Sequence, residues 1–308
     1  DRYWESRDDL AHYDLTFGER IGWKWDHVLR ELQLRGWTPA RAGERVSLFD
    51  WGCGSGIAGR RVIQHFGADK FDALTVWDHS PLASDYAEEA ARRAFPRLAV
   101  AQATPSLLVS DTPLGLLVIS HVLNELPPEA VTSLRATIAR ATAVIWVEPG
   151  THDISRQLSG WRDELRGTFR VVAPCTHELG CPVLAEGNER HWCHFFAPPP
   201  SEIFADSNWV KFGQRAGIDL RSLPYCFIAL QHEPIEALAP GWSRIVGRPA
   251  HFKPYARWLD CSAEGLIELE LPKRADSALF KQIDRTKAPL VYRWRRDGDK
   301  VLGGEALG

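Results

Sequence analysis

Methionine is absent from this chain of 308 residues, position 1 included. We therefore expect that a further N-terminal piece precedes Asp1. No run of about 18 apolar residues occurs, so we expect no membrane-spanning helix, and no secretory signal peptide is visible. An excess of charge of one sign is also lacking. The net charge of −3 excludes a general electrostatic attraction to nucleic acid.

Cysteine is scarce and forms no dense framework. The chain has six cysteines, and 44% of its residues are hydrophobic. A chain of this size can bury a core without the disulfide bonds on which small secreted scaffolds depend. We therefore expect a cytoplasmic monomer with free thiols.

Strands and helices alternate in the first half of the chain. Short apolar runs that alternate with helical patterns are typical of a doubly wound parallel sheet. The run at 114–120 is almost entirely apolar, so we expect both of its faces to be covered. The sequence predicts strands at 46–50, 74–78, 98–101, 114–120 and 143–147, and helices at 57–66, 83–95 and 128–141.

Three domains follow from the pattern along the chain. Residues 1–42 form a helical N-terminal segment, because apolar and aromatic residues recur there at helical spacing. Residues 43–232 form an α/β domain whose insertion, 173–226, is irregular and rich in cysteine. A stretch of that length needs an internal staple. Residues 233–308 form a basic, β-rich extension. Further strands are predicted at 169–172, 225–231, 257–261, 266–271 and 290–294, and helices at 153–166 and 275–284.

A glycine-rich turn closes the first predicted strand. Asp50 is followed by Gly52, Gly54 and Gly56 in the sequence DWGCGSG. Glycine lets the backbone approach a ligand and take positive φ without a Cβ clash. An acid at the strand end suits a cationic or hydroxyl-bearing ligand, whereas a phosphate site favours a helix terminus without carboxylates. The spacing also differs from the GxGxxG of dinucleotide folds. A second acid, Asp78, ends the next strand, where an acid commonly holds ribose hydroxyls.

Four cysteines form the second set of candidate site residues: Cys175, Cys181, Cys193 and Cys226. Their spacing is not the tight CxxC pairing of zinc knuckles, which disfavours zinc without excluding it. Iron–sulfur cubanes accept four thiolates from irregular loops. The sequence thus predicts a metal centre, with [4Fe–4S] favoured over zinc. Four unrelated buried thiols are the alternative.

Positive charge is concentrated near the C-terminus. Between Arg244 and Arg296 twelve Lys or Arg residues stand against six Asp or Glu. Such an excess indicates either a phosphate-binding face or an ordinary solvated surface. Aromatic residues among these charges either stack on unpaired bases or form the core of the extension, and the core is favoured for most of them. They are Trp242, Tyr255, Trp258, Tyr292 and Trp294.

The glycine loop together with Asp78 resembles the class I S-adenosylmethionine (SAM)-dependent methyltransferases. This resemblance implies a Rossmann-like fold with a mostly parallel, seven-stranded sheet. It implies that the loop backbone faces the amino-acid end of SAM, that Asp50 orients it, that Asp78 binds the ribose and that His79 lies beside the adenine. The segment that begins with Ser120 and His121 would line the methyl-transfer pocket. At the end of the third strand only Gln102 is available near the adenine. The implied SAM-binding residues are Asp50, Gly52, Gly54, Gly56, Asp78, His79, Ser120 and His121.

A wider set of motifs resembles the methyltransferase-like family tied to the mitochondrial small ribosomal subunit, with this chain as a bacterial relative. The resemblance implies an assembly factor that binds small-subunit rRNA and holds a [4Fe–4S] cluster on the four cysteines. No Asn-Pro-Pro-Tyr motif is present, and residues 120–125 offer no nucleophile in a Pro-Cys setting, so no catalytic residue is assigned. The matching motifs are DWGCGSG at 50–56, SHVLNEL at 120–126, the Cys175–Cys181 pair with its prolines, WCHF at 192–195, and RIV at 244–246.

Three functions remain open from the sequence. The first is a SAM-dependent methyltransferase of small-subunit rRNA, with the cluster as a structural staple. The second is a non-catalytic rRNA-binding assembly factor whose cluster senses iron or redox state. The third is a small-molecule methyltransferase with a structural zinc site and no RNA affinity. Four spread cysteines would saturate a cubane, so we expect no radical chemistry from it.

Overall fold

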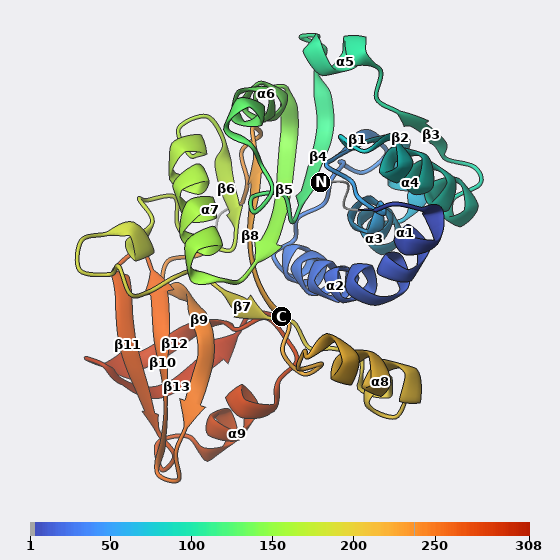
Figure 1. The fold of residues 1–308 in the computed structure, drawn as a ribbon. Helices are drawn as coiled ribbons and strands as arrows, with labels where there is room; N and C mark the ends of the chain where they lie inside the picture. The colour runs from blue at the N-terminus through green and yellow to red at the C-terminus, as the bar shows by residue number, and fades with distance from the viewer. Residues whose placement is uncertain (1–3, 237) are drawn as a thin grey trace. The chain divides into compact units, whose positions relative to one another are not determined.

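The structure is a computed structural model that describes residues 4–236 and 238–308. It divides into two compact units (Figure 1). The first comprises Asp1–Leu29, Thr38–Val147 and Pro198–Leu223. The second comprises Arg30–Trp37, Glu148–Ala197 and Pro224–Gly308.

A parallel sheet forms the centre of the first unit. Its strand order is β3-β2-β1-β4-β5, and all of its pairings are parallel. Leu116, Leu117, Val118 and Ile119 of β4 are fully buried, as the apolar run predicted. The predicted doubly wound sheet is confirmed in this unit. The strands are β1 (Val46–Trp51), β2 (Phe71–Trp77), β3 (Ala99–Gln102), β4 (Leu114–Ser120) and β5 (Ala141–Pro149).

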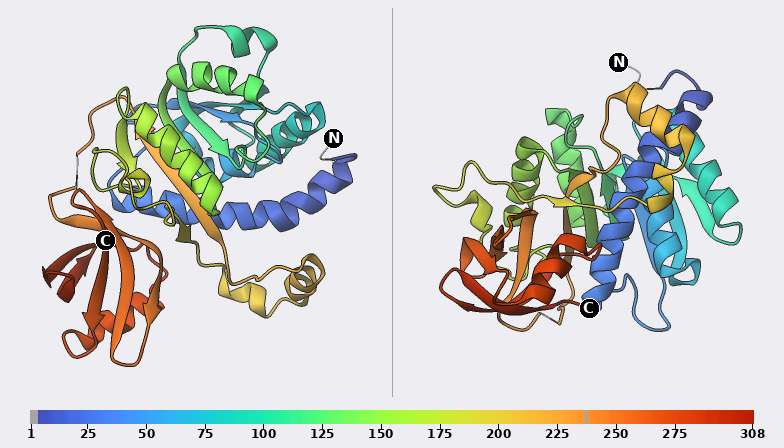
Figure 2. Two further views of the ribbon diagram at one scale, coloured as in Figure 1. Left: turned by 60° about the vertical axis from the view of Figure 1, so that its left-hand side comes forward. Right: turned by 90° about the horizontal axis from the view of Figure 1, so that it is seen from below.

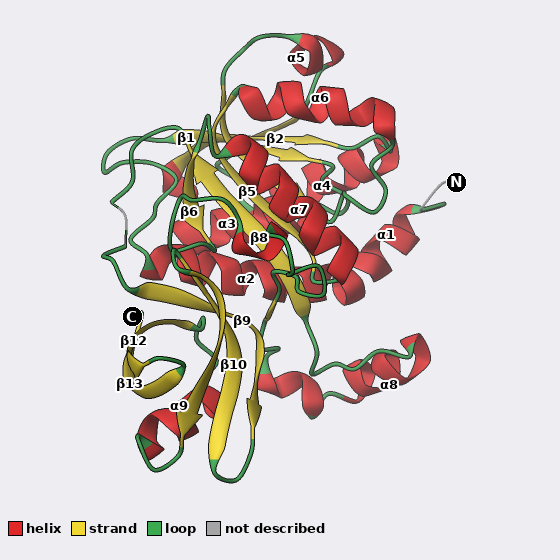
Figure 3. Cartoon of the chain, turned by 90° about the vertical axis from the view of Figure 1, so that its left-hand side faces the viewer, coloured by secondary structure: helices red, strands yellow, loops and turns green. Residues whose placement is uncertain are grey.

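Helices connect these strands and cover the sheet (Figure 3). Helix α3 packs on β1 and β4, and α4 packs on β2 and β3. Proline at the first turn and a side-chain cap define the start of α4, where the Ser80 hydroxyl accepts from the Ala83 N–H. The short α5 was not predicted. The helices are α3 (Ile57–Phe66), α4 (Pro81–Ala94), α5 (Pro105–Val109) and α6 (Pro128–Ala139).

The N-terminal helices confirm the predicted helical lead-in. Helix α1 (Arg7–Tyr13) starts with a capping box between Ser6 and Asp9. It continues through a π-helical turn (Asp14–Gly18) into α2 (Glu19–Leu34). Such turns are rare and often occur at functional sites.

The expected irregular stretch from Pro174 to Pro224 contains more regular structure than predicted. A 3₁₀ turn (Ser201–Phe204) and the helix α8 (Ser207–Ala216) belong to the first unit. Asp206 caps the start of α8, and Gly217, at φ +64°, ends it. The helix was missed because its ten residues follow a proline run and carry few aliphatic side chains.

Three strands and a helix open the second unit. Strand β8 pairs antiparallel with β6 and with the short β7. The sequence predicted seven strands up to Gln231. It did not predict β7, which is two residues long and has no detectable sequence period. The elements are α7 (His152–Leu165), β6 (Arg170–Ala173), a 3₁₀ turn η3 (Pro182–Leu184), β7 (Phe195–Phe196) and β8 (Pro224–Gln231).

A closed five-stranded barrel completes the second unit (Figure 2, orange to red). Its strand order is β10-β11-β13-β12-β9. Trp258 and Tyr292 lie in its core, which confirms the core interpretation for both. The β-rich character is also confirmed, but β9 and β13 were not predicted. The elements are β9 (Trp242–His251), β10 (Tyr255–Ser262), β11 (Gly265–Pro272), α9 (Ser277–Arg285), β12 (Val291–Asp297) and β13 (Lys300–Ala306).

Within residues 4–236 and 238–308, no helix has both the length and the apolar content needed to cross a bilayer.

Candidate functional site

The glycine loop has the backbone that its sequence predicts. Gly52, Gly54 and Gly56 have φ values of +67°, +53° and +75°, a region that other residues avoid. Space is also restricted. A Cβ at Gly52 would lie 2.8 Å from Cγ1 of Val122, and one at Gly56 would lie 2.8 Å from Cβ of Ala87. Glycine is therefore required by conformation at all three positions and by packing at two of them.

Asp78 closes this loop from the end of the neighbouring strand. Its Oδ2 accepts from the Gly54 N–H at 2.9 Å, and its Oδ1 accepts from the Ser80 N–H at 2.9 Å. Nδ1 of His79 lies 3.0 Å from the same Oδ1. A carboxylate offers about four acceptor positions, so Asp78 retains capacity for ligand hydroxyls. The imidazole of His79 is 72% exposed.

Asp50 is fully buried beneath the loop. Its Oδ2 accepts from the Gly59 N–H at 3.0 Å, while Oδ1 has no hydrogen-bond partner among the described residues. Burial raises the pKa of this carboxyl to about 7; the Gly59 N–H opposes the shift and the charge of Asp78 adds to it. An ionised Asp50 is thus costly here, and a nearby cation would lower that cost.

A chain of polar side chains follows the end of β4. Lys24 Nζ lies 3.2 Å from Nε2 of His121, and Nδ1 of His121 lies 3.1 Å from Oγ of Ser120. Trp25 Nε1 donates to the same hydroxyl at 3.0 Å. Because an ammonium only donates, Nε2 is the acceptor and Nδ1 carries the proton.

His121 is held in an unusual state by this chain. Burial, and then the charge of Lys24, keep its pKa well below the ordinary value, so the ring is neutral near pH 7. Its φ of +56° lies in the left-handed region. Such backbone strain is concentrated at functional sites. Sequence reasoning selected Ser120 and His121 but missed Lys24 and Trp25, because a helix 95 residues upstream carries no signal for this contact.

Other polar groups near the loop are engaged by the protein. Arg60 of α3 pairs with Asp14 at 2.6 Å and donates to the Ser55 carbonyl at 3.3 Å. Asp14 begins the π-helical turn, so this ion pair ties the turn to the loop. Gln102 donates to Asp85 and Glu88 at 2.8 and 2.7 Å, so α4 already orients its amide. The role of Asp14 was not visible in the sequence.

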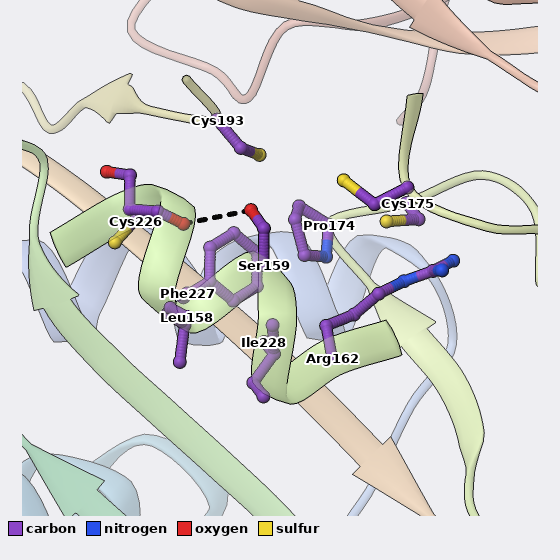
Figure 4. Close-up of a pocket in the computed structure, with 11 residues that line it drawn as sticks. Leu158, Ser159, Arg162, Pro174, Cys175, Cys193, Cys226, Phe227 and Ile228 are labelled. Carbon is purple, nitrogen blue, oxygen red and sulfur yellow. Dashed lines mark hydrogen bonds between the residues drawn. The ribbon is translucent and has the colours of Figure 1, made fainter. Parts of the chain in front are cut away.

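The four predicted cysteines line one small cavity in the second unit, together with Arg162. In Figure 4 the side chains of Cys175 and Cys193 point toward the space above Pro174, and Cys226 lies on the other side of the view. The thiol of Cys226 donates to the Pro149 carbonyl at 3.4 Å. The cavity has donor chemistry that suits a thiophilic centre.

The predicted metal centre is not shown as a preformed site and stays a prediction. In the part of the chain that the structure describes, no three or more His, Cys, Asp or Glu side chains come close enough together to hold one metal ion. The hydrogen bond of Cys226 to a backbone carbonyl gives one reason, because it directs that sulfur to a partner of its own.

The thiols of the cavity influence one another. Burial raises the pKa of Cys193 well above the ordinary value, and Cys175 and Cys181 raise it further. Burial also raises the pKa of Cys261, on β10, well above the ordinary value, and Cys175 and Cys181 raise it further. The predicted set of four did not include Cys261, which lies on a barrel strand 35 residues beyond Cys226. Arg162 supplies positive charge here, and its Nε has no hydrogen-bond partner among the described residues.

Arginine side chains hold the irregular cysteine loop in this structure. Arg156 of α7 donates to the carbonyls of Val183, Asn188 and His191 at 2.8 to 3.1 Å. Arg162 donates to the His177 carbonyl at 3.0 Å.

The end of α2 and Asp163 of α7 complete this set of contacts. Arg35 donates to the carbonyls of Val172, Pro174 and Cys175 at 2.7 to 3.1 Å, and the Asp163 carboxylate accepts from the Cys181 N–H at 3.0 Å. The staple that the long loop requires is therefore built from charged side chains bonded to backbone.

Two solved structures match this chain at low similarity. Magnesium protoporphyrin IX methyltransferase from Synechocystis PCC 6803, with bound SAH, is 12% identical; the match covers 70% of this chain and 84% of that one, with a TM-score of 0.41. Precorrin-6y C5,15-methyltransferase from Geobacter metallireducens is 11% identical, with 66% and 87% covered and a TM-score of 0.39. These similarities are too low to argue from. No match was found among curated proteins.

A protein-family comparison gives a match that covers most of the chain. The family is described as mitochondrial small ribosomal subunit Rsm22, and its model matches residues 35–287. This range includes the glycine loop, all four cysteines of the cavity and most of the barrel. The chain therefore belongs to the Rsm22 family of the mitochondrial small ribosomal subunit.

Proposed function

We propose that the chain is a SAM-binding, methyltransferase-like protein that acts on the small ribosomal subunit. Membership of the Rsm22 family is the observation that carries the ribosomal part of this proposal. The SAM part is supported by the strand–loop–helix unit, in which three left-handed glycines are closed by Asp78.

In this proposal each loop residue has a defined task. The glycine backbone admits the amino-acid end of the cofactor, and Asp78 accepts from ribose hydroxyls while it holds the Gly54 N–H. The buried Asp50 supplies negative charge toward the cationic end of SAM. The bound cofactor would supply an electrophilic methyl group, and Ser120 and His121 would border the acceptor.

Equilibrium dialysis with S-adenosylhomocysteine tests the cofactor site. We expect saturable binding to the wild type and at least tenfold weaker binding to Asp78→Ala, because that variant loses both the ribose acceptor and the bond that closes the loop. Asp111→Ala, an exposed carboxyl on the same unit, is the matched control. Equal binding by Asp78→Ala and wild type would refute the proposed site.

A non-catalytic assembly factor is the second candidate. It is favoured by the state of His121, whose two ring nitrogens are both engaged, by Lys24 and by Ser120. A neutral ring without a free lone pair is not poised to accept a proton from an acceptor base. Small subunits incubated with methyl-labelled SAM distinguish the two: label in rRNA supports the enzyme, and stable association without transfer supports the assembly factor.

We further propose that the cavity holds a [4Fe–4S] cluster on Cys175, Cys181, Cys193 and Cys226. Each thiolate of a cubane binds a different iron, so the ligands are spread more widely than around a single zinc ion. The four thiols that line one cavity support this proposal. Cys226 would have to turn from the Pro149 carbonyl.

Iron and sulfide analysis of anaerobically purified protein tests the cluster. We expect about four iron and four sulfide per chain, and a marked loss of both in Cys175→Ser. Cys53→Ser changes a buried thiol of the first unit and is the control, which should keep the full content. Stoichiometric zinc without sulfide, or equal content in the two variants, would exclude the cubane.

A further inference from the structure

The barrel of the second unit has the connectivity of an OB-fold. Strands β9, β10 and β11 form an antiparallel meander, and α9 follows β11. Strand β12 returns to pair with β9, and β13 pairs antiparallel with β12 and parallel with β11. Five strands in this order, closed into a barrel with a helix between the third and the fourth, define the OB-fold, which binds oligonucleotides.

The elements that bind in OB-folds meet at one end of this barrel. Binding there uses the face of the second and third strands and the loops after the first and fourth. The first of these loops, which we call the L12 loop, is 252–254, between β9 and β10. Its Pro254 carbonyl accepts from the Lys273 N–H at 2.8 Å, directly after β11. The loop between β12 and β13 reaches the same end, because its Asp299 carbonyl accepts from the Glu270 N–H at 2.9 Å.

An exposed aromatic pair forms the surface of the L12 loop. The rings of Phe252 and Tyr255 are stacked with centroids 4.7 Å apart. Phe252 is 43% exposed. A backbone bond from its N–H to the Tyr255 carbonyl, 2.9 Å, fixes the hairpin. The guanidinium carbon of Arg257 lies 5.8 and 5.9 Å from the two ring centroids. A rigid, solvent-facing aromatic pair with a flanking cation is suited to stacking on an unpaired base.

The charges around the L12 loop fit a polyanion. Lys253, Lys273 and Arg274 are exposed at this end. Two nearby carboxylates are paired with cations: Glu268 with Arg257 at 3.3 Å, and Glu270 with Lys300 at 2.7 Å. Of the other acids, Asp276 caps α9 and Asp284 lies 3.6 Å from His251.

Two features limit the extent of this surface. The loop between β12 and β13 carries Asp297 and Asp299, which disfavours phosphate on that side. At the other end of the β10–β11 face, β11 contacts the 3₁₀ turn Pro182–Leu184, so the insertion occupies part of the face. The open surface is therefore on the L12 side.

We propose that the barrel binds a short single-stranded RNA segment at the L12 loop. One or two bases stack on Phe252 and Tyr255, and the adjoining phosphates contact Lys253, Lys273 and Arg274. This inference extends the proposed function, because it assigns the contact with ribosomal RNA to a defined surface. It does not depend on SAM binding or on a cluster.

Fluorescence anisotropy on the full chain tests the proposal. The probe is a labelled 12-nucleotide single-stranded RNA of mixed sequence, and the comparison is the same strand annealed to its complement. We expect tighter binding of the single strand and roughly tenfold weaker binding by Phe252→Ala, since stacking on an aromatic ring is worth about one factor of ten or more per base. Leu302→Ala, which removes another exposed apolar side chain of the barrel, should bind as the wild type does.

The outcomes separate this inference from the proposed function. Unchanged affinity in Phe252→Ala, or equal affinity for duplex and single strand, would overturn the L12 site. Dialysis with S-adenosylhomocysteine on the same Phe252→Ala protein reports the cofactor site independently. We expect unchanged cofactor binding there, which shows that the lost RNA affinity does not come from the cofactor site of the first unit.

Discussion

Asp50 is the residue at which burial and function conflict most. Its carboxyl has a pKa of about 7 in the folded chain, above the ordinary value of about 3.9. A carboxyl whose pKa is raised in the folded state lowers the stability at any pH at which it is ionised in the unfolded chain. Asp50 therefore leaves the free energy of unfolding unchanged below about pH 4. It lowers this free energy increasingly as the pH rises from about 4 to about 7, and by a constant amount above that.

Asp50→Asn should remove this pH dependence. The amide oxygen can still accept from the Gly59 N–H, so we expect the variant to gain stability relative to the wild type between pH 4 and 7, by at most about 4 kcal/mol. Urea unfolding at several pH values measures the difference. Asp111→Asn, an exposed site, should show none. A difference for Asp50→Asn that stays the same from pH 4.5 to 8 would contradict the burial argument.

Single residues could be predicted where a local pattern marks them. Gly52 and Asp78 stand at the ends of apolar strands, and the chain has few other ways to make that turn. Lys24 and Cys261 could not be predicted, because their importance comes from neighbours far away in the sequence. The aromatic interpretation was mixed: Trp258 and Tyr292 are core residues, while Tyr255 pairs with Phe252, which the sequence did not single out.

The loop before α3 is the element with the least freedom to vary. Gly56→Ala places a methyl group 2.8 Å from the Cβ of Ala87 at a φ of +75°. Gly43→Ala has a similar φ, +81°, but nothing within 4 Å. Both should lose about 1–2 kcal/mol from the backbone, and Gly56→Ala a further 1–3 kcal/mol from overpacking. Equal free energies of unfolding for the two variants, measured in urea, would show that the contact relaxes freely.

The cysteine loop depends on α7 for its shape. Arg156→Gln removes most of three charge-assisted bonds to the loop carbonyls, each of which is worth about 1.5–3 kcal/mol. We expect hydrogen exchange of the amides in 182–191 to accelerate by at least tenfold. Arg166→Gln, at the C-cap of the same helix, half-exposed and with weaker contacts, is the matched variant and should leave this exchange unchanged. Similar protection in both variants would exclude Arg156 as the staple.

Strands with a clear apolar pattern in the sequence were predicted, and strands without one were not. Strands β1 to β5 are apolar runs between helices, so their positions follow from the sequence. Strand β9 contains Gly247 and Pro249, and β13 contains Gly303 and Gly304, residues that weaken a strand pattern. These strands exist because their neighbours in the barrel pair with them.

At the scale of the whole molecule, local charge matters more than net charge. The chain is weakly acidic, at −3, yet the L12 surface is basic. With about three phosphate contacts, the logarithm of RNA affinity should fall with the logarithm of salt concentration with a slope near −2. Lys253→Gln and Lys273→Gln should each reduce the slope by about 0.7, while Lys281→Gln on α9 should not. A slope insensitive to the first two changes would place the phosphates elsewhere.

The α/β character, the glycine loop and the β-rich extension could all be anticipated. Closure of the barrel could not, because it depends on the pairing of β9 with β12 and of β11 with β13 across long stretches of chain. The metal centre stays a prediction. Spacing alone identified four thiols of one cavity, but it could not show that Cys226 would turn to a carbonyl.

Closure of the barrel also decides how another molecule can attach to it. An open sheet presents unpaired N–H and C=O groups along its rim, and foreign peptides often dock by joining that rim as an extra strand. In this barrel every strand has a paired neighbour on each side, and a single bridge between Glu270 of β11 and Lys300 of β13 closes the ring. A foreign strand therefore finds no free edge strand to join, and recognition by the barrel must rely mainly on its side chains and connecting loops.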